Sequence, residues 1–520
     1  MPDTAFTLQP GTLTLARLHG LWRRPQPLEL AADCWDAVRR SAEAVAAVID
    51  SGKAVYGITT GFGSLAKTQI PADQVAELQR RLVLSHCAGV GDALPDRVVR
   101  LALILKVNAL ARGHSGLRPE VIEALARLHN ADALPVIPAQ GSVGASGDLA
   151  PLAHLSAALI GEGEIKLGSQ TLPAAKALAK LDMAPLTLAA KEGLALLNGT
   201  QVSTALALDG LFAGLDAIAA LLNAGALTVD AALGSDVPFD PRIQDLRGQP
   251  GQIEAAAVLR ALLKGSAIRA SHLDCERVQD PYSLRCQPQV MGAVLDTLRA
   301  AAAMLAREAN AVSDNPLVFA ESGEVLSGGN FHAEPVALAA DAMAVALAEI
   351  GALSERRTAL LVDAHMSGGL PAFLVADPGL NSGFMIAEVT SAALMSENKQ
   401  RAAPASIDST PTSANQEDHV SMACHGARRL LEMADNLERI VAIEALVAAQ
   451  GVEFRAPLKT SPRLAAVLAR LRRSVPALGP DRLMAPDLET AAALVRDGTL
   501  IEAAGRAGLP ALDREDQDHE

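Results

Sequence analysis

The sequence is poor in aromatic residues and in cysteine. Only 2% of its 520 residues are Phe, Trp or Tyr, and its five cysteines form no C-x-x-C pair. An odd number of scattered cysteines suggests neither a disulfide framework nor a thiolate zinc site. We therefore expect reduced thiols in a protein whose core is built mainly from alanine and leucine.

The sequence also lacks a basic stripe and a long uninterrupted apolar segment. Its 59 acidic and 45 basic residues give a net charge of −14, and the basic residues are dispersed, which argues against nucleic acid and anionic membranes as partners. No basic stretch followed by an apolar core occurs in Met1–Leu15, and the longest apolar candidate, Ala337–Leu353, is interrupted by Asp341 and Glu349. We expect a cytoplasmic protein without a membrane segment.

What is abundant is amphipathic helix. Half of the residues are hydrophobic, and apolar positions recur at helical spacing in several long segments. These segments predict a mainly α fold, an elongated bundle of long helices with a loop-built active site. The predicted helices are Val98–Ala111, Val121–Leu128, Leu188–Leu227, Gln252–Leu263, Gln289–Ala311, Ala333–Arg357 and Asp418–Gln450.

The chain divides by pattern into three regions. Residues 1–205 form an N-terminal region with two glycine-rich loops, residues 206–510 hold the long-helix bundle and C-terminal helices, and residues 511–520 form a charged tail. The loops between helices are dense in Gly, Pro, Ser and Asn. Because binding and catalytic residues concentrate on loops held by a rigid scaffold, we expect the chemistry there.

Three short strings imitate the serine β-lactamase and penicillin-binding pattern. They are Ser64–Lys67 (S-x-x-K), Ser313–Asn315 (S-D-N) and Lys459–Ser461, which is one residue from K-T-G. The third string should lie on a strand, whereas Lys459 precedes a predicted helix. We keep this hypothesis as an alternative from a different class of enzyme, although strings of this length arise by chance.

Another pair imitates a metal site. His332-Ala333-Glu334 fits the H-x-E of zinc deaminases, but no P-C-x-x-C follows to complete the ligands. We therefore expect no metal.

The most informative block is Gly141–Leu152, which contains Ala145-Ser146-Gly147. A tight turn that presses the Gly147 nitrogen onto the Ala145 carbonyl carbon would allow the backbone to cyclise, because Gly147 has no side chain to obstruct it. Loss of water from the ring and of the Ser146 hydroxyl would then leave an exocyclic methylene, which is a strong electrophile.

This block resembles the signature of the aromatic amino acid ammonia-lyase family. In that family an Ala-Ser-Gly triplet becomes 4-methylideneimidazol-5-one (MIO), so the resemblance implies an ammonia-lyase/fumarase-like helical fold and MIO formed from Ala145, Ser146 and Gly147. Further similar blocks extend over most of the chain: the tyrosine loop 56–63, Leu197–Thr200, Gln279–Arg285, Ser327–Pro335 and Asn381–Met385. The only two tyrosines, Tyr56 and Tyr282, both lie in these blocks.

The choice of substrate depends on the residues that would surround its ring. His86 stands where members acting on phenylalanine have an apolar residue, and Glu417 supplies an acid opposite the ring. Tyrosine members also use a histidine at the first position, so Glu417 in the context Ala414-Asn415-Gln416 decides. This polar pair suits an imidazole, so we expect L-histidine as substrate and urocanate as product, with a tyrosine or phenylalanine ammonia-lyase or an aminomutase as the alternative.

The resemblance also implies roles for the other residues of these blocks. Arg285 would hold the substrate carboxylate, Asn198 and Gln279 would orient the carboxylate and the MIO carbonyls, and Phe331 would pack on the ring. Tyr56 is the first candidate for the base.

Tyr282 and Glu417 remain rivals to Tyr56 as the base. The resemblance implies a homotetramer, in which Tyr56, Ser146 and Tyr282 need not come from one chain.

Overall fold

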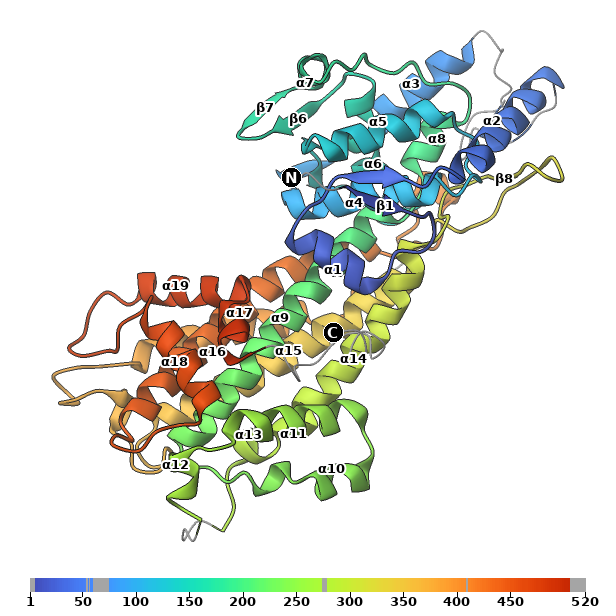
Figure 1. The fold of residues 1–520 in the computed structure, drawn as a ribbon. Helices are drawn as coiled ribbons and strands as arrows, with labels where there is room; N and C mark the ends of the chain where they lie inside the picture. The colour runs from blue at the N-terminus through green and yellow to red at the C-terminus, as the bar shows by residue number, and fades with distance from the viewer. Residues whose placement is uncertain are drawn as a thin grey trace. The chain divides into compact units, whose positions relative to one another are not determined.

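The structure is a computed structural model that describes residues 5–52, 55, 57–58, 74–273, 278–407 and 410–505. Most of the described residues lie in α-helices, and the strands are only three or four residues long (Figure 1). The mainly helical fold expected from the sequence is therefore confirmed.

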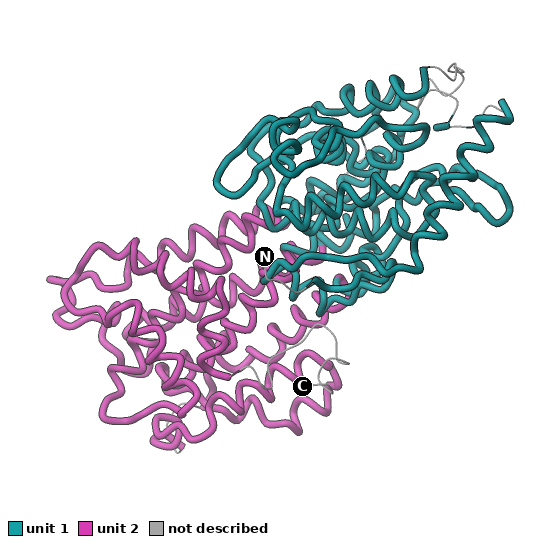
Figure 2. The backbone as a smooth tube through the Cα atoms, turned by 45° about the horizontal axis from the view of Figure 1, so that its top comes forward, with its two compact units in different colours: residues 1–209, 302–341, 404–429 teal, residues 210–301, 342–403, 430–520 magenta. Residues whose placement is uncertain are grey.

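The chain forms two compact units (Figure 2). Unit 1 comprises residues 1–209, 302–341 and 404–429, and unit 2 comprises residues 210–301, 342–403 and 430–520. Four long helices contribute residues to both units: α9 (Gln201–Ala231), α14 (Gln287–Ala309), α15 (Glu334–Val362) and α17 (Ala423–Glu453). Each unit is thus assembled from segments that are far apart in the sequence.

Unit 1 combines helices with four small sheets. Its shorter helices are α1 (Leu15–Arg23), α2 (Cys34–Asp50), α3 (Val75–His86), α4 (Asp96–Leu110), α5 (Pro119–Asn130), α6 (Leu149–Leu159), α7 (Ala174–Lys180) and α8 (Glu192–Leu197). The strands are β1 (Phe6–Leu8), β2 (Leu28–Leu30), β3 (Val90–Ala93), β4 (Ala133–Pro135), β5 (Pro138–Gln140), β6 (Glu164–Leu167), β7 (Gln170–Pro173), β8 (Leu317–Phe319) and β9 (Glu324–Leu326). They pair as β1–β2 (parallel), β3–β5, β4–β6–β7 and β8–β9 (all antiparallel).

One predicted helix is broken. The structure has α8 and α9 in place of a single helix over Leu188–Leu227, so that prediction is wrong. Asn198 has an extended backbone (φ −77°, ψ 145°) and Gly199 has φ +126°, a value that glycine alone adopts readily. Apolar periodicity continues on both sides of the break, which concealed it from the sequence pattern. The other predicted long helices are confirmed, with ends shifted by a few residues.

Unit 2 is almost wholly helical in its described residues. Besides the long helices it contains α10 (Pro241–Arg247), α11 (Pro250–Leu263), α12 (Ala267–Ala270), α13 (Tyr282–Arg285), α16 (Met385–Arg401), α18 (Pro462–Arg472), α19 (Ala485–Arg496) and α20 (Thr499–Ala504). At its centre Arg357 and Glu444 form a fully buried bidentate ion pair, with N–O distances of 2.6 and 2.8 Å. The carboxylate also accepts hydrogen bonds from Thr228 (2.8 Å) and Ser354 (2.6 Å). Such a pair stabilises a core only when its remaining hydrogen bonds are satisfied, as they are here.

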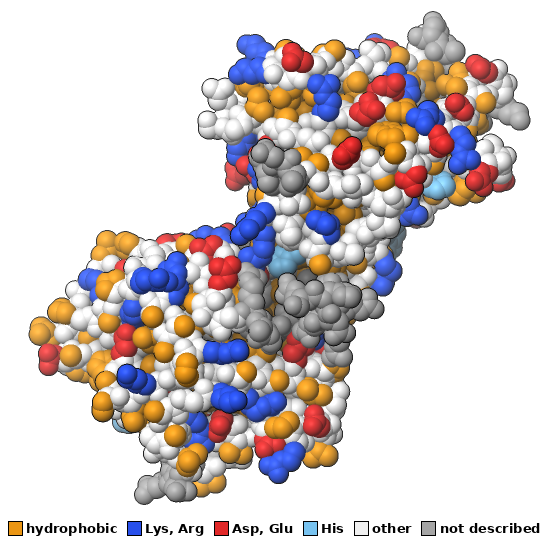
Figure 3. Space-filling view, viewed as in Figure 1, with side chains coloured by type: hydrophobic (Ala, Val, Ile, Leu, Met, Phe, Trp, Pro, Cys, Tyr) orange, Lys and Arg blue, Asp and Glu red, His pale blue; other side chains and the backbone are white. Residues whose placement is uncertain are grey.

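Within the described part of the chain, three helices are long and apolar enough to cross a membrane by length and composition alone: α9, α14 and α15. The candidate Ala337–Leu353 named from the sequence lies in α15, whereas α9 and α14 were not named. The apolar window of α9 is entirely buried inside the protein, which explains a helix that is hydrophobic on all sides. On the face drawn in Figure 3, acidic and basic side chains are interspersed, in agreement with the dispersed charge of the sequence.

Candidate active site

The loop between β5 and α6 carries the Ala145-Ser146-Gly147 triplet. The Gly147 N–H donates a hydrogen bond of 3.2 Å to the Gly144 carbonyl, which closes a tight turn, and Ser146 lies in the left-handed region with φ +56°. A left-handed conformation costs a non-glycine residue roughly 1–2 kcal/mol, and it persists only where the surroundings impose it. The turn keeps the Gly147 amide folded back, as cyclisation requires.

Gly147 packs directly against the backbone of Gly199. The two residues form a parallel bridge, and the Gly199 carbonyl accepts a 2.8 Å hydrogen bond from the N–H of Asp148. A Cβ on Gly147 would lie 2.2 Å from that carbonyl oxygen, and the φ of Gly147 is +81°. Only glycine fits this position, so the triplet suits an MIO group. The same contact brings the buried Asn198 beside the loop.

Lys106 on α4 anchors the helix break. Its side chain is fully buried, and Nζ donates hydrogen bonds to the Asn198 carbonyl at 2.6 Å and to Oε1 of Gln201 at 3.4 Å. Helix α8 ends at Leu197 and Asn198 caps it, so the lysine supplies a donor to the carbonyl of the capping residue. Burial lowers the pKa of Lys106 to about 7, against the opposing effect of the Asp314 charge.

Asp148 ties the loop to the start of α9. Its Oδ2 accepts hydrogen bonds from the Ser203 N–H (2.7 Å) and hydroxyl (2.9 Å), and Oδ1 accepts one from the Ser142 hydroxyl (3.4 Å). Burial raises the pKa of Asp148 to about 6, although these hydrogen bonds oppose the rise. Asp148, which follows the triplet, therefore fixes the loop to the first turn of α9.

The segment before α17 covers the other side of the loop. The Met422 N–H donates a 3.0 Å hydrogen bond to the Val143 carbonyl, and a Cβ on Gly144 would lie 2.2 Å from Oγ of Ser421. Glu417 belongs to this segment, and its Oε2 atom is buried without a hydrogen-bond partner among the described residues. Buried polar atoms are nearly always paired, so this oxygen is available to a polar ligand.

His86 is the last residue of α3. Its Nδ1 donates a 2.8 Å hydrogen bond to the Leu82 carbonyl, which fixes the ring and leaves Nε2 for a ligand. Three residues later, Gly89 lies against Gly141, since a Cβ on Gly141 would be 3.0 Å from the Gly89 Cα. The His86 segment thus reaches the start of the loop.

Phe331 lies in the loop that precedes α15. Its neighbour His332 places Nε2 3.1 Å from the carbonyl oxygen of His419, with the two ring centroids 5.7 Å apart. Because Glu417 is two residues before His419, this contact joins the Phe331 and Glu417 segments. Within unit 1 the structure therefore connects the segments of the predicted residues Ala145, Ser146, Gly147, Asn198, His86, Glu417 and Phe331.

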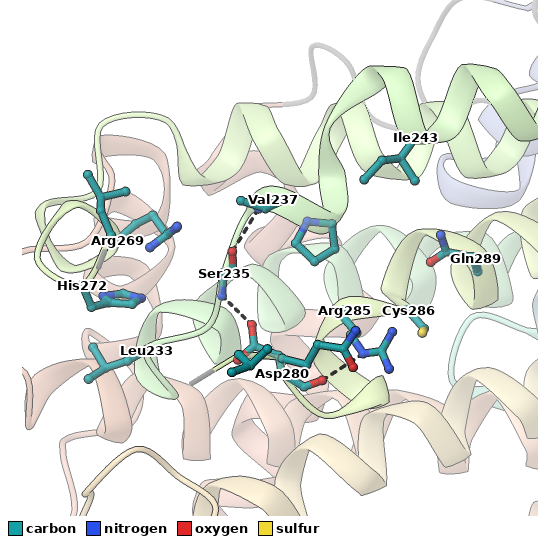
Figure 4. A pocket seen from close by; sticks show the side chains of 14 residues that line it. Leu233, Ser235, Val237, Ile243, Arg269, His272, Asp280, Arg285, Cys286 and Gln289 are labelled. Atoms are coloured by element: carbon teal, nitrogen blue, oxygen red, sulfur yellow. Dashed lines mark hydrogen bonds between the residues drawn. The ribbon is translucent and has the colours of Figure 1, made fainter. Parts of the chain in front are cut away.

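The remaining described candidates form a group in unit 2. Gln279 and Arg285 line a pocket of about 510 Å³ (Figure 4). Arg285 donates through Nε to the Asp280 carbonyl (3.0 Å), and its Cζ lies 4.2 Å from the ring centroid of Tyr282, which is 70% exposed. Among the described residues no carboxylate pairs with Arg285, so its guanidinium is available to an anion.

Three predictions concern residues outside the described part of the chain. Tyr56 and most of its loop lie there, as does Ser64–Lys67 of the β-lactamase pattern; the tail 511–520 does too.

The S-D-N string of the β-lactamase pattern has a structural role. Oγ of Ser313 accepts hydrogen bonds from the Thr200 N–H (3.3 Å) and from Nε2 of Gln201 (3.0 Å), and Asp314 forms a buried ion pair with Lys191 at 2.8 Å. Lys459 precedes α18 and is not on a strand. These contacts remove the support that the two strings gave to a β-lactamase.

Lys106 and Asp148 were missed as candidates from the sequence. Lys106 had a usable signal, because it stands alone in the apolar run 101–107, and a charged residue is almost never fully buried without a partner. No comparable signal in the sequence marked Asp148 beyond its position after the triplet, because its partner Ser203 lies 55 residues away.

Comparisons with known proteins agree with this geometry. A family model described as aromatic amino acid lyase matches residues 13–473. A histidine ammonia-lyase from Aromatoleum aromaticum is 64% identical over 485 residues, which cover 93% of this chain and 92% of the relative. The crystal structure of histidine ammonia-lyase from Trypanosoma cruzi is similar with a TM-score of 0.89 and 38% identity, covering 97% of this chain and 96% of that one.

A tyrosine aminomutase structure from Streptomyces globisporus is also similar, with a TM-score of 0.92 and 36% identity over 98% of this chain and all of that chain. These matches confirm the predicted fold class.

Proposed function

Because the chain belongs to the aromatic amino acid lyase family, we propose that it eliminates ammonia from L-histidine and releases urocanate. The observation that carries the reaction is the turn at Ala145–Gly147, with Ser146 in the left-handed region and Gly147 against Gly199. The high identity to a histidine ammonia-lyase supports the substrate. The aminomutase similarity keeps a tyrosine or phenylalanine reaction as the second candidate.

The triplet would itself be converted to MIO, whose methylene is an electrophile that would activate the substrate for loss of ammonia, a poor leaving group. The protein's own part is to fix the turn. Asp148 holds it from α9, and Lys106 holds the Asn198 carbonyl at the helix break. Asn198 would then direct its side-chain amide toward the triplet carbonyls and the substrate carboxylate, and the family resemblance gives Gln279 the same role.

Arg285 binds the substrate carboxylate in this proposal. Its planar guanidinium matches a carboxylate with two parallel hydrogen bonds, and no described acid competes for it. Among the candidates of unit 1, Phe331 packs on the imidazole, Glu417 accepts its N–H through the unpaired Oε2, and His86 binds the second ring nitrogen.

The proton at the β-carbon goes to a base. Tyr56 remains our first candidate, with Tyr282 and Glu417 as rivals. A phenol needs nearby positive charge to lower its pKa from about 10 before it can act near neutral pH.

We also propose that the enzyme works as a homotetramer in the cytoplasm. Helix α15 leaves Leu338 and Val345 51% and 54% exposed, which is unusual for a long apolar helix and suits a subunit interface. The four described cysteines are free thiols, as a reducing compartment requires.

Co-expression tests whether sites are shared between subunits. Ser146→Ala and Tyr282→Phe should each be inactive, and the two together should recover part of the activity because some mixed sites contain only intact residues. Sedimentation should show four chains. A monomer, or mixed assemblies without activity, would contradict shared sites.

The reaction is tested by incubation with L-histidine, L-phenylalanine and L-tyrosine, following the ultraviolet absorbance of urocanate, cinnamate and coumarate. We expect urocanate to form fastest. Ser146→Ala should lose activity, whereas Ser169→Ala, at an exposed turn of the same unit, should retain it. Preferential deamination of tyrosine or phenylalanine, or conversion of either to a β-amino acid, would favour the second candidate. Full activity of Ser146→Ala would exclude the proposed chemistry.

A further inference from the structure

We propose that His332, Glu334 and His419 bind one divalent transition-metal ion, with Zn²⁺ as the ion that fits best. One ring nitrogen of each histidine and one carboxylate oxygen of Glu334 all lie within 4.8 Å of one another. Ligand atoms that share a zinc ion at 2.0–2.2 Å are roughly 3.5 Å apart. Side-chain movements of about an ångström would therefore bring the three ligands around one ion.

His332 is held in the state that a metal ligand needs. Its Nε2 lies 3.1 Å from the His419 carbonyl oxygen, and because a carbonyl only accepts, Nε2 carries the proton. The neutral ring then keeps a lone pair on Nδ1. Metal-binding histidines commonly donate their second N–H to a backbone carbonyl in this way, which fixes the ring for coordination.

Glu334 provides the second observation. It is the first residue of α15, and its Oε2 atom is buried without a hydrogen-bond partner among the described residues. An unpaired buried carboxylate oxygen is costly unless something binds it. A metal ion placed among the two imidazoles would satisfy it.

The ligand types select the ion. Two nitrogen donors and one carboxylate match the His₂Glu set of zinc sites that keep a fourth position open, whereas Mg²⁺ and Ca²⁺ prefer oxygen donors. The sequence suggested no metal because the H-x-E pair at His332 lacks the cysteine ligands of a deaminase. The fold provides His419 in their place, 85 residues after Glu334.

An ion here would tie the loop of Phe331 to the segment of Glu417, since His332 and His419 are one and two residues from them. It would thereby hold together two residues that surround the substrate ring, a consequence that rests on the proposed function. The binding of the ion does not rest on it.

The test uses the full chain without a histidine tag, stripped with a chelator and titrated with Co²⁺ and Zn²⁺. Calorimetry should give one site per chain, and the cobalt spectrum should show visible bands without the near-ultraviolet band of a thiolate ligand. Mg²⁺ should not compete. Glu334→Gln and His419→Gln should each weaken binding at least 10-fold, whereas the exposed His365→Gln should bind as the wild type does.

Circular dichroism and thermal unfolding establish that both ligand variants are folded; His419 is exposed and Glu334→Gln preserves shape, so the fold is expected to survive. Absence of binding at millimolar metal, an affinity of both ligand variants equal to that of the wild type, or a thiolate band would overturn the proposal. Because binding is measured without substrate, these outcomes are independent of whether the enzyme forms urocanate.

Discussion

Each unit buries a charged cluster, but the two clusters have different partners. In unit 2, Arg357 and Glu444 pair with each other between regular helices, and hydroxyl groups complete the hydrogen bonds of the carboxylate. In unit 1, Lys106 donates to a backbone carbonyl and an amide, and the carboxylate of Asp148 accepts from Ser203 and Ser142. Lys106 and Asp148 thus hold the glycine-rich loop and the helix break, whereas two other buried charges of unit 1, Lys191 and Asp314, pair with each other at 2.8 Å.

The pKa values follow this difference. Burial lowers the pKa of Lys106 to about 7, because the charges of Asp314 and Asp148 offset only part of its desolvation, and burial raises the pKa of Asp148 to about 6 despite its hydrogen bonds. Perturbed values of this kind cluster at functional sites. We infer that the unit 1 cluster serves a reactive loop, while the ion pair of unit 2 serves stability alone.

The largest effect is expected from Gly147→Ala. The new Cβ would meet the Gly199 oxygen at 2.2 Å and would strain a residue at φ +81°, so the turn could not form. Displacement of reacting groups by about an ångström costs on the order of 100-fold in rate, and we expect at least that loss in kcat. Gly163→Ala is the control, since its φ is +74° but its Cβ would meet nothing within 4 Å. If Gly147→Ala were as active as Gly163→Ala, the reaction would not depend on the turn at Gly147.

Glu444→Gln should have the largest effect on stability. It leaves the guanidinium of Arg357 buried without its counter-charge, which costs about 3–5 kcal/mol. Chemical denaturation measures the loss, and the remaining folded enzyme should keep its kcat. In Glu489→Gln, which breaks an exposed pair with Arg439, the change should be below about 1 kcal/mol. A reduced kcat with unchanged stability in Glu444→Gln would contradict the purely stabilising role assigned to the Arg357–Glu444 pair.

Glu417→Gln tests a functional carboxylate against the structural one of Glu444. Glu417 has a buried oxygen without a hydrogen-bond partner among the described residues, whereas both oxygens of Glu444 are paired. Loss of a hydrogen bond to the substrate ring is worth about 1–3 kcal/mol, so kcat/KM for histidine should fall roughly 10- to 100-fold. The free energy of unfolding should change little. Steady-state kinetics provide the measurement, with Glu123→Gln on the exposed surface of α5 as control. Unchanged kinetics would remove Glu417 from the substrate site.

The smallest effect is expected from Lys106→Met. Without its donor, the Asn198 carbonyl is less firmly held, and we expect kcat to fall up to about 10-fold. Stability supplies a second readout. The lysine has a pKa near 7 when folded and an ordinary value of 10.5, so the unfolded chain binds more protons between these limits.

The unfolding free energy of the wild type should therefore rise, relative to the variant, as pH increases from about 7 to 10. Unfolding at several pH values measures this difference, and Lys176→Met, on the exposed face of α7, should show no such trend. A constant difference would mean that Lys106 stays charged in the fold.

The sequence predicted the residues of the 145–147 loop but not the distant residues that hold this loop in place. Ser146 and Gly147 could be proposed from the sequence because the proposed chemistry depends on adjacent residues. The break at Asn198 could not, since apolar periodicity continues through it, and Lys106 contacts it from 92 residues earlier. His419 beside His332 was missed for the same reason: the contact spans 87 residues, and local pattern does not encode it.

The central claim is that the Ala145-Ser146-Gly147 turn is chemically modified, and intact mass spectrometry of the purified chain tests it most directly. The account predicts a chain lighter than its sequence by two water molecules, and a Ser146→Ala variant that lacks this loss. An active wild-type chain with its full sequence mass would contradict the account.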